Sequence, residues 1–370
     1  MQSTMGITQL YIHDRRGENT MHACGFIPEM LERKATNTSL QRGNRVIREE
    51  SFSREIRSRR GTKRFLPSFH PDAVVSPGSK VVVFDAKNGT RLPGKMAGDD
   101  NVECTGYKKD SVSYVYLVTN MYLRFLNSVL GVDGLDNKGS RIISTIDFSY
   151  FFNNAFFDGS QMVYGSGDGI TFSEFDRDAT VISHELTHGL IENICPLEYK
   201  NQSGALNESI ADVFASCFIQ WMDNTSPKNS TWLIGDHCMK DIGMVSYSLR
   251  SMKSPGDGFI NHPILGSDPQ KGHMENYYDG KEDFGGVHIN SGIPNNAFYL
   301  FCTALEEKLG YSSSWGIPLS IWYSALKKCN DTSCDFARFA QLTLDAAREV
   351  ENSEVANVLE EAWEDVGILI

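Results

Sequence analysis

The 370-residue sequence predicts an α+β fold in which a sheet-rich part is followed by a mainly helical part. Two observations lead to this prediction. In the first half, short apolar runs bounded by turn-forming residues have the length of strands. In the second half, apolar residues recur every three or four positions, which is the helical period. We therefore expect a leader at 1–60, a sheet-rich domain at 61–195 and a helical domain at 196–370.

The sheet-rich part contains three strand-like runs and one long helix. The first run, at 80–85, is rich in valine and is followed by an Asn-Gly turn signal. A helix is expected at 110–130, because apolar residues there are spaced by three or four. Two further strands are expected at 141–148 and 161–165, and the second of these leads into a glycine-rich loop.

The helical part begins with two helices that carry most of the polar motifs. The first is expected at 180–193 and is ended by Pro196, which cannot continue a helix. The second is expected at 203–222, with Ser203 as its N-cap. Four more helices follow from the same periodicity, at 293–309, 318–327, 336–349 and 353–366.

The first 60 residues differ from the rest, because they are polar, rich in arginine and only weakly periodic. One apolar cluster interrupts them at 24–31. The segment ends in the basic stretch 57–61, which many proteases could cut. Two interpretations stay open on these grounds, a disordered tail and a leader removed from the mature protein.

Composition limits the partners and the compartment. A net charge of −12 argues against nucleic acid, because there is no excess of lysine and arginine to neutralise phosphates. No apolar run of about 18 residues is available to span a membrane. Residues 1–20 lack the apolar stretch of a secretory signal peptide. We therefore expect a monomer that is cytoplasmic or exported by a route other than the Sec pathway.

The eight cysteines are scattered and do not form the paired spacing of a cysteine zinc site. Cys329 and Cys334 are close enough in sequence to form a disulfide. Since no signal peptide is seen, we expect most of the cysteines to be free buried thiols.

The sequence HELTH at 184–188 is the first motif that indicates chemistry. On a helix, positions i and i+4 share one face, so His184 and His188 can bind the same metal ion. Glu185 lies beside the first histidine and can reach a water molecule in an open coordination position. A metzincin site would need glycine and histidine where this chain has Ile191 and Ile194, so that class is excluded.

Glu208 is the candidate third ligand, because a turn at Pro196 and a second antiparallel helix would return it to the two histidines. Two histidines and one carboxylate leave one position open, which is typical of a catalytic zinc. Asp212, one helical turn later, and Asn207 can each orient a histidine through its second ring nitrogen. The sequence therefore predicts one catalytic Zn²⁺.

Four motifs in order resemble those of the thermolysin family of zinc metallopeptidases, from about Val81 to the C-terminus. They are NNAFFDGSQMVYGSGDG at 153–169, HELTH, GALNESIADVF at 204–214 and GGVHINSG at 285–292. Thermolysin itself has a zinc site of two histidines and one glutamate. The resemblance implies a two-domain fold with the zinc helix in the cleft between the domains. It also implies an endopeptidase that cuts internal bonds of protein or peptide substrates.

The resemblance assigns roles to individual residues. Glu185 would be the general base, and Tyr199 and His288 would stabilise the oxyanion, with Asp283 orienting the histidine. Arg250 would bind a substrate carbonyl, and Asn154 with Ala155 would form the edge that pairs with the peptide. The pocket for the side chain just after the cleaved bond would be apolar, so the resemblance implies a preference for a large hydrophobic residue there. The residues of this pocket would be Phe172, Phe175, Val181 and Leu249.

Two features depart from thermolysin. Where the family often has carboxylate ligands for calcium, this chain has Thr180, Ile219, Thr231 and Leu233, so bound calcium is doubtful. The short leader resembles that of the protealysin branch, although Glu29 replaces the second proline of its motif. The resemblance then implies a zymogen in which the leader inhibits the active site of the same chain. Cys24 is a further candidate, because its thiolate could approach the zinc. The candidate inhibitory residues are Cys24, Phe26, Ile27, Pro28 and Leu31.

Three other functions agree with part of the pattern. They are a catalytically inactive homologue that binds peptides, a non-enzymatic interaction protein with the same fold, and an aminopeptidase with the same type of zinc site. The first two leave the complete set of chemical groups unexplained. An aminopeptidase would need residues that bind a free amine, and the sequence contains no such motif.

Overall fold

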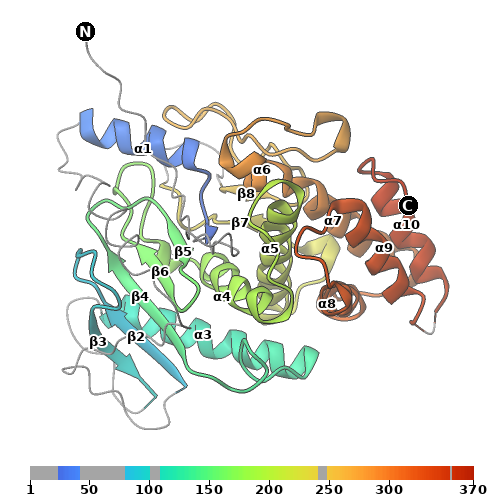
Figure 1. Cartoon of the computed structure of the whole chain (residues 1–370), viewed down its shortest axis with the longest axis horizontal. Coiled ribbons are helices and arrows are strands. Elements are labelled where there is room, and N and C mark those ends of the chain that lie inside the picture. Colours follow the sequence, from blue (N-terminus) through green and yellow to red (C-terminus); the bar gives the residue numbers. More distant parts are fainter. Residues whose placement is uncertain (1–23, 42–79, 101–108, 241–247, 351) are drawn as a thin grey trace, which may run out of the picture.

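The computed structural model describes residues 24–41, 80–100, 109–240, 248–350 and 352–370. It has the expected α+β architecture. Figure 1 shows a twisted sheet at one end, the helices α4 (Ala179–Ile194) and α5 (Asn201–Asp223) in the centre and the C-terminal helices at the other end. The described part contains no helix that is long and apolar enough to cross a membrane.

A six-stranded mixed sheet forms the N-terminal part, in the order β1-β5-β6-β4-β2-β3. β4 lies inside the sheet and pairs in parallel with β2 on one side and β6 on the other. All of its residues are buried, as expected for a strand inside a sheet that is covered on both faces, although Ser144, Thr145 and Asp147 interrupt its apolar sequence. The strands are β1 (Cys24–Gly25), β2 (Val81–Asp85), β3 (Lys95–Asp99), β4 (Ile142–Phe148), β5 (Ala155–Phe157) and β6 (Met162–Gly165).

Helix α3 (Lys109–Leu130) packs against β2, β3 and β4, and helix α4 packs against β5 and β6. The three strands and the helix expected in this part are therefore confirmed. β3 and β5 were not expected. β3 is a strand at the sheet edge with charged residues at both ends, and β5 has only three residues, so neither has a clear apolar alternation.

The two central helices are α4 (Ala179–Ile194) and α5 (Asn201–Asp223). Asp178 caps α4 by accepting hydrogen bonds from the backbone N–H groups of Thr180 and Val181. The prediction that Ser203 caps α5 is wrong, because the helix already begins at Asn201. The Ser203 hydroxyl instead donates back to the carbonyls of Glu198 and Lys200, at 2.8 and 2.9 Å.

The four C-terminal helices are found where the periodicity predicts them, and α6 is additional. α6 (Asp283–Asn290) is helical only after three residues in the left-handed region, Phe284, Gly285 and Gly286. A Cβ atom on Gly285 would lie 2.2 Å from the Asn201 side-chain oxygen, so this turn requires glycine. The four predicted C-terminal helices are α7 (Gly292–Leu309), α8 (Ile317–Lys328), α9 (Phe336–Ala347) and α10 (Glu354–Glu364). A two-stranded ribbon joins β7 (Leu233–Ile234) and β8 (Arg250–Ser251).

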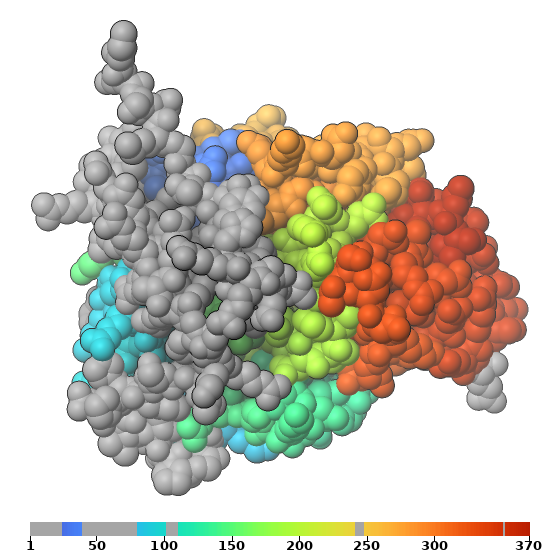
Figure 2. All heavy atoms as spheres, in the orientation of Figure 1, coloured from blue at the N-terminus to red at the C-terminus, as the bar shows by residue number. Residues whose placement is uncertain are grey.

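Part of the leader is folded. β1 adds to the edge of the sheet, and α1 (Glu29–Gln41) packs across the molecule, where Lys34 Nζ donates to the carbonyl of Leu265 at 2.7 Å. Figure 2 shows the blue atoms of α1 beside the orange segment that follows β8. Residues 24–41 are thus not a disordered tail. The expected end of the leader near residue 60, and its basic stretch, lie outside the described residues.

The seven described cysteines are all buried, and Cys195, Cys217, Cys238, Cys302, Cys329 and Cys334 are free thiols. Cys104 lies outside the described residues. The expectation of free buried thiols is therefore confirmed for the part of the chain that the structure covers.

Candidate active site

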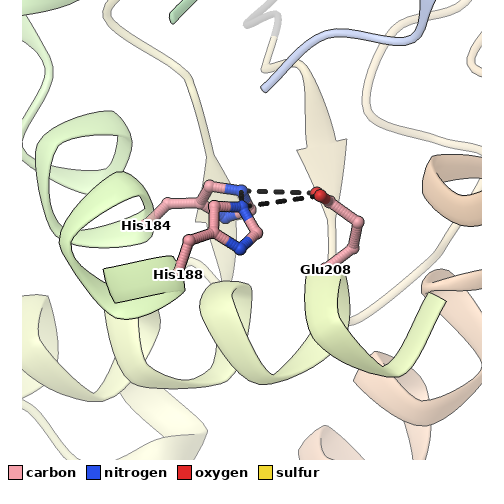
Figure 3. Close-up of side chains that lie close together, drawn as sticks. All are labelled: His184, His188 and Glu208. Atoms are coloured by element: carbon pink, nitrogen blue, oxygen red, sulfur yellow. Dashed lines mark hydrogen bonds and ion pairs between the residues drawn. The ribbon is translucent and has the colours of Figure 1, made fainter. Parts of the chain in front are cut away.

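The three predicted metal ligands lie together in the centre of the molecule. His184 and His188 project from one face of α4, and Glu208 reaches them from α5 (Figure 3). Their ligand atoms all lie within 4.8 Å of one another. The Nε2 atoms of the two histidines are 3.0 Å apart. The Glu208 carboxylate lies 3.3 Å from Nε2 of His184 and 3.5 Å from Nε2 of His188.

A zinc ion fits this group of side chains. Glu208 is 1% exposed, and its Oε2 atom has no hydrogen-bond partner among the described residues. A buried charged oxygen without a partner is costly, so a cation between the three side chains would satisfy it. Two imidazole nitrogens and a carboxylate are ligands that zinc prefers in catalytic sites.

A second layer of polar groups orients both histidines. Asp212 Oδ1 lies 2.8 Å from His184 Nδ1, and Asn207 Oδ1 lies 2.9 Å from His188 Nδ1. Both Nδ1 atoms are therefore engaged, which leaves both Nε2 atoms free for a metal. The predicted neighbours Asp212 and Asn207 thus contact the histidines that the sequence indicated.

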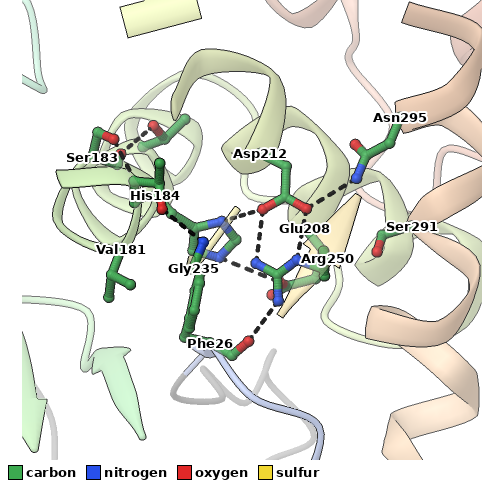
Figure 4. A network of polar contacts seen from close by, with 12 residues as sticks. Phe26, Val181, Ser183, His184, Glu208, Asp212, Gly235, Arg250, Ser291 and Asn295 are labelled. Carbon is green, nitrogen blue, oxygen red and sulfur yellow. Dashed lines mark hydrogen bonds and ion pairs between the residues drawn. The ribbon is translucent and has the colours of Figure 1, made fainter. Parts of the chain in front are cut away.

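Asp212 also binds residues from the helical domain (Figure 4). Arg250 donates to it through Nε at 2.9 Å and through Nη2 at 2.8 Å. Asn295, in α7, donates to its second oxygen at 2.9 Å. Burial opposes its ionisation, but the charge of Arg250 and the hydrogen bond from His184 lower the pKa of Asp212 to about 2. Sequence reasoning missed Asn295, whose only signal is a buried amide in the first turn of α7.

Glu185 is fully buried beside the metal ligands. Neither of its carboxylate oxygens has a hydrogen-bond partner among the described residues. Burial raises the pKa of Glu185 to about 8, because a low-dielectric site disfavours the ionised form. A carboxylate that accepts a proton near neutral pH is suited to act as a general base.

Tyr199, His288 and Asp283 form a chain of hydrogen bonds next to Glu208. Asp283 accepts from His288 through Nδ1 at 2.6 Å and through the backbone N–H at 2.8 Å. The Tyr199 hydroxyl donates to Glu208 and lies 3.3 Å from His288 Nε2. Burial alone would lower the pKa of His288, but the charges of Glu208 and Asp283 raise it to about 9. A protonated imidazole donates hydrogen bonds from both ring nitrogens.

The leader lies against these groups. His288 Nε2 donates to the carbonyl of Gly25, and Arg250 Nη1 donates to the carbonyl of Phe26 at 2.7 Å. Asn154 and Ala155, the predicted peptide-binding edge, also contact the leader. The proposed inhibitory residues Cys24, Phe26, Ile27, Pro28 and Leu31 are all buried.

The Phe26 ring lies in an apolar pocket and is fully buried. Its centre is 5.0 Å from that of the His184 ring and 4.3 Å from the Arg250 guanidinium carbon. A Cβ atom placed on Gly235 would lie close to Phe26, Leu249 and the Cys238 sulfur. Sequence reasoning missed Gly235 and Cys238, which follow β7 and carry no motif. The other predicted pocket residues are buried in the same core, namely Phe172, Phe175 and Val181.

The predicted contact between Cys24 and the metal stays a prediction. Cys24 is buried with Tyr199 and Val287, while the ligand atoms grouped within 4.8 Å belong to the two histidines and Glu208. Burial, with the charges of Glu208 and Glu185, raises the pKa of Cys24, which disfavours the thiolate that binds zinc.

A second group of acidic and histidine side chains consists of Asp178, Asp236 and His237. Both oxygens of Asp178 already accept hydrogen bonds, one from the start of α4 and the other from the backbone N–H of His237. Helix capping therefore accounts for this group, and we assign no metal to it.

Comparisons with known proteins agree with the geometry of the site. A family model described as the catalytic domain of thermolysin metallopeptidases matches residues 72–192, and the model of their alpha-helical domain matches 195–368. Protease PrtS of a Photorhabdus species is 38% identical over 81% of this chain and 79% of its own length. The "Extracellular metalloprotease" of Pectobacterium carotovorum is 38% identical over 77% of this chain and 80% of its own.

A solved structure is also similar, the precursor of protealysin from Serratia proteamaculans. It superposes with a TM-score of 0.77 and 32% identity, covering 93% of this chain and 99% of that one.

The contact of Asp212 with His184 predicts a role in holding zinc. We expect Asp212→Asn to weaken zinc binding by about 10–100-fold, because the histidine loses the charged partner that orients it. Competition of the full chain with a chromogenic chelator measures this affinity. Asp223→Asn, at the exposed end of the same helix, is the matched control and should leave it unchanged. Equal zinc affinity in both variants would contradict the role.

Proposed function

Since the chain belongs to the thermolysin family of zinc metallopeptidases, we propose that it is an endopeptidase made as a zymogen. It cuts internal peptide bonds before a large hydrophobic residue. The observation that carries this proposal is the leader segment in the cleft. The carbonyl of Gly25 there accepts a hydrogen bond from His288, whose Nε2 atom lies 3.3 Å from the Tyr199 hydroxyl, and the next side chain, Phe26, is fully buried.

Glu185 is the proposed general base. When zinc is bound, it polarises the scissile carbonyl and lowers the pKa of a water molecule in the site. Glu185 then takes a proton from that water and passes it to the leaving nitrogen. The buried position of the carboxyl, and the absence of hydrogen-bond partners among the described residues, leave it free for this transfer.

Tyr199 and His288 are the proposed donors to the oxyanion. Negative charge develops on the carbonyl oxygen as the water adds, and fixed donors in a water-poor site stabilise it. Asp283 acts as a positioning residue, since two hydrogen bonds hold the imidazole in place. Arg250, Asn154 and Ala155 bind the backbone of the substrate after the cleaved bond.

The leader is the proposed inhibitor of this site in cis. Residues 24–28 occupy the cleft, and α1 fixes them to the surface through Lys34 and the carbonyl of Leu265. Because the same side chains bind the leader and the substrate, both cannot be bound at once.

Removing the base tests the mechanism. We expect Glu185→Gln to lower the rate of hydrolysis of a blocked dipeptide by at least about 100-fold, since general-base catalysis typically contributes that much. Both proteins are first treated with trypsin, which cuts after arginine, to open the leader equally. Glu364→Gln, at the exposed end of α10, is the control. A variant that keeps its zinc and retains a tenth of the activity would exclude Glu185 as the base.

Specificity is tested with a peptide library. New N-termini should be mostly Leu, Ile or Phe, because the pocket that holds Phe26 is apolar. Mass spectrometry of the digest identifies the residue after each cut. A preference for charged residues at this position would contradict the proposed pocket.

The calcium sites of other family members are tested by chelation. Thr180 uses its hydroxyl to contact Asp178 and the backbone N–H of Gly235, and Ile219 packs against the hydrophobic core. Such groups do not replace carboxylate ligands for calcium. We expect a calcium-selective chelator to leave the melting temperature unchanged while zinc stays bound. A steep loss of thermal stability would show that calcium is structural here.

A further inference from the structure

The leader crosses the cleft in the direction and register of a substrate. β1 pairs with β5 in antiparallel fashion, with Cys24 opposite Phe157 and Gly25 opposite Phe156. The pairing continues one residue further, where the Phe26 N–H donates to the carbonyl of Ala155 at 2.9 Å. Addition of a strand to a sheet edge is a common way to bind an extended peptide.

Both peptide groups after Phe26 are held by side chains. Arg250 donates to the carbonyl of Phe26, and Asn154 accepts from the N–H of Ile27 at 2.8 Å and donates to its carbonyl at 3.3 Å. The carbonyls of Phe26 and Ile27 are thus bound by Arg250 and Asn154. In this segment, the carbonyl that meets His288 is that of Gly25.

The side chains on either side of the Gly25–Phe26 bond also suit the site. Phe26 is fully buried in its pocket. Gly25 lies where space is limited, because a Cβ atom there would come within 3.1 Å of the Asn154 amide nitrogen. A small residue before the bond and a large apolar one after it therefore fit the cleft.

From this geometry we propose that the protein cuts its own leader between Gly25 and Phe26, within one molecule. The inference rests on the proposed function. The oxygen of a water molecule adds to the carbonyl carbon of Gly25, and the bond from this carbon to the Phe26 nitrogen breaks. Glu185 takes one proton from the water and delivers it to that nitrogen. The second proton of the water also passes to that nitrogen, so the products are a carboxylate at Gly25 and an ammonium group at Phe26.

The cut alone does not empty the cleft. The part of the leader that starts at Phe26 keeps its contacts with Arg250 and Asn154. Glu32, in α1, accepts from the Asn154 amide at 3.1 Å, and Lys34 stays bound to the carbonyl of Leu265. The first cut therefore leaves a product in the pocket, and full activity needs a second event that removes α1.

The experiment starts from the full chain purified in a chelator and then supplied with zinc. We expect intact-mass spectra to show a fragment that ends at Gly25 and N-terminal sequencing to give Phe26. The rate should not change over a tenfold range of protein concentration, since the reaction is intramolecular. A cut at any other bond first, or a rate proportional to concentration, would overturn the proposal.

Variants of the leader test the register. Phe26→Ala should slow the cut by at least about 10-fold, because the pocket loses its apolar side chain. Asn37→Ala, at an exposed position of α1, is the control and should change the rate less than twofold. Equal rates in the two variants would overturn the assignment of Phe26.

A second measurement does not depend on turnover. In the zinc-loaded Glu185→Gln protein, the amides of Phe26 and Ile27 should resist hydrogen exchange, and Phe26→Ala should abolish this protection. Fast exchange of both amides would overturn the register. If trypsin-treated protein hydrolyses a blocked dipeptide while the Gly25–Phe26 bond stays intact, self-cleavage is wrong and the proposed function stands. If neither the blocked dipeptide nor the Gly25–Phe26 bond is cut, the proposed function itself fails.

Discussion

The buried carboxylate of Asp212 is the contact on which the rest of the site depends. A charge without access to water must be fully paired, because its desolvation costs several kcal/mol. Asp212 is paired by His184 from the zinc helix, by Arg250 from β8 and by Asn295 from α7. One carboxylate thus fixes a metal ligand and the arginine that binds the peptide backbone. The same group therefore orients a histidine of the candidate zinc site and the arginine that binds the leader backbone.

Much of the fold and of the metal site could be predicted from sequence. Long periodic segments such as α3 and α7 were found nearly in full, because burial of one helix face leaves a clear pattern. His184, His188 and Glu208 were found because their spacing is set by helix geometry. Local rules failed where tertiary contacts decide. Ser203 was placed at the start of α5, yet it lies inside the helix and bonds to carbonyls of the preceding turn.

The residues that sequence reasoning missed have no local signal. Gly235 and Cys238 enter the pocket because the ribbon of β7 and β8 brings them beside the leader, 209 positions or more from Phe26 in sequence. α1 was missed because it is polar and its stability comes from packing on the rest of the molecule. α6 was missed because its first turn is left-handed at Phe284 and at the two glycines. His288, the proposed donor to the oxyanion, follows that turn, so an unusual backbone places this side chain.

The pairing of β1 with β5 also affects how copies of this protein behave toward one another. Once β1 leaves, β5 becomes the border of the sheet, with unpaired N–H and C=O groups facing outward. Such borders promote association between molecules, because strands of two copies can pair. Here the border has only three residues, and a strand that short offers little to a second copy. If the leader is removed as proposed, the exposed edge can pair with an extended peptide, and its short length limits pairing between two copies.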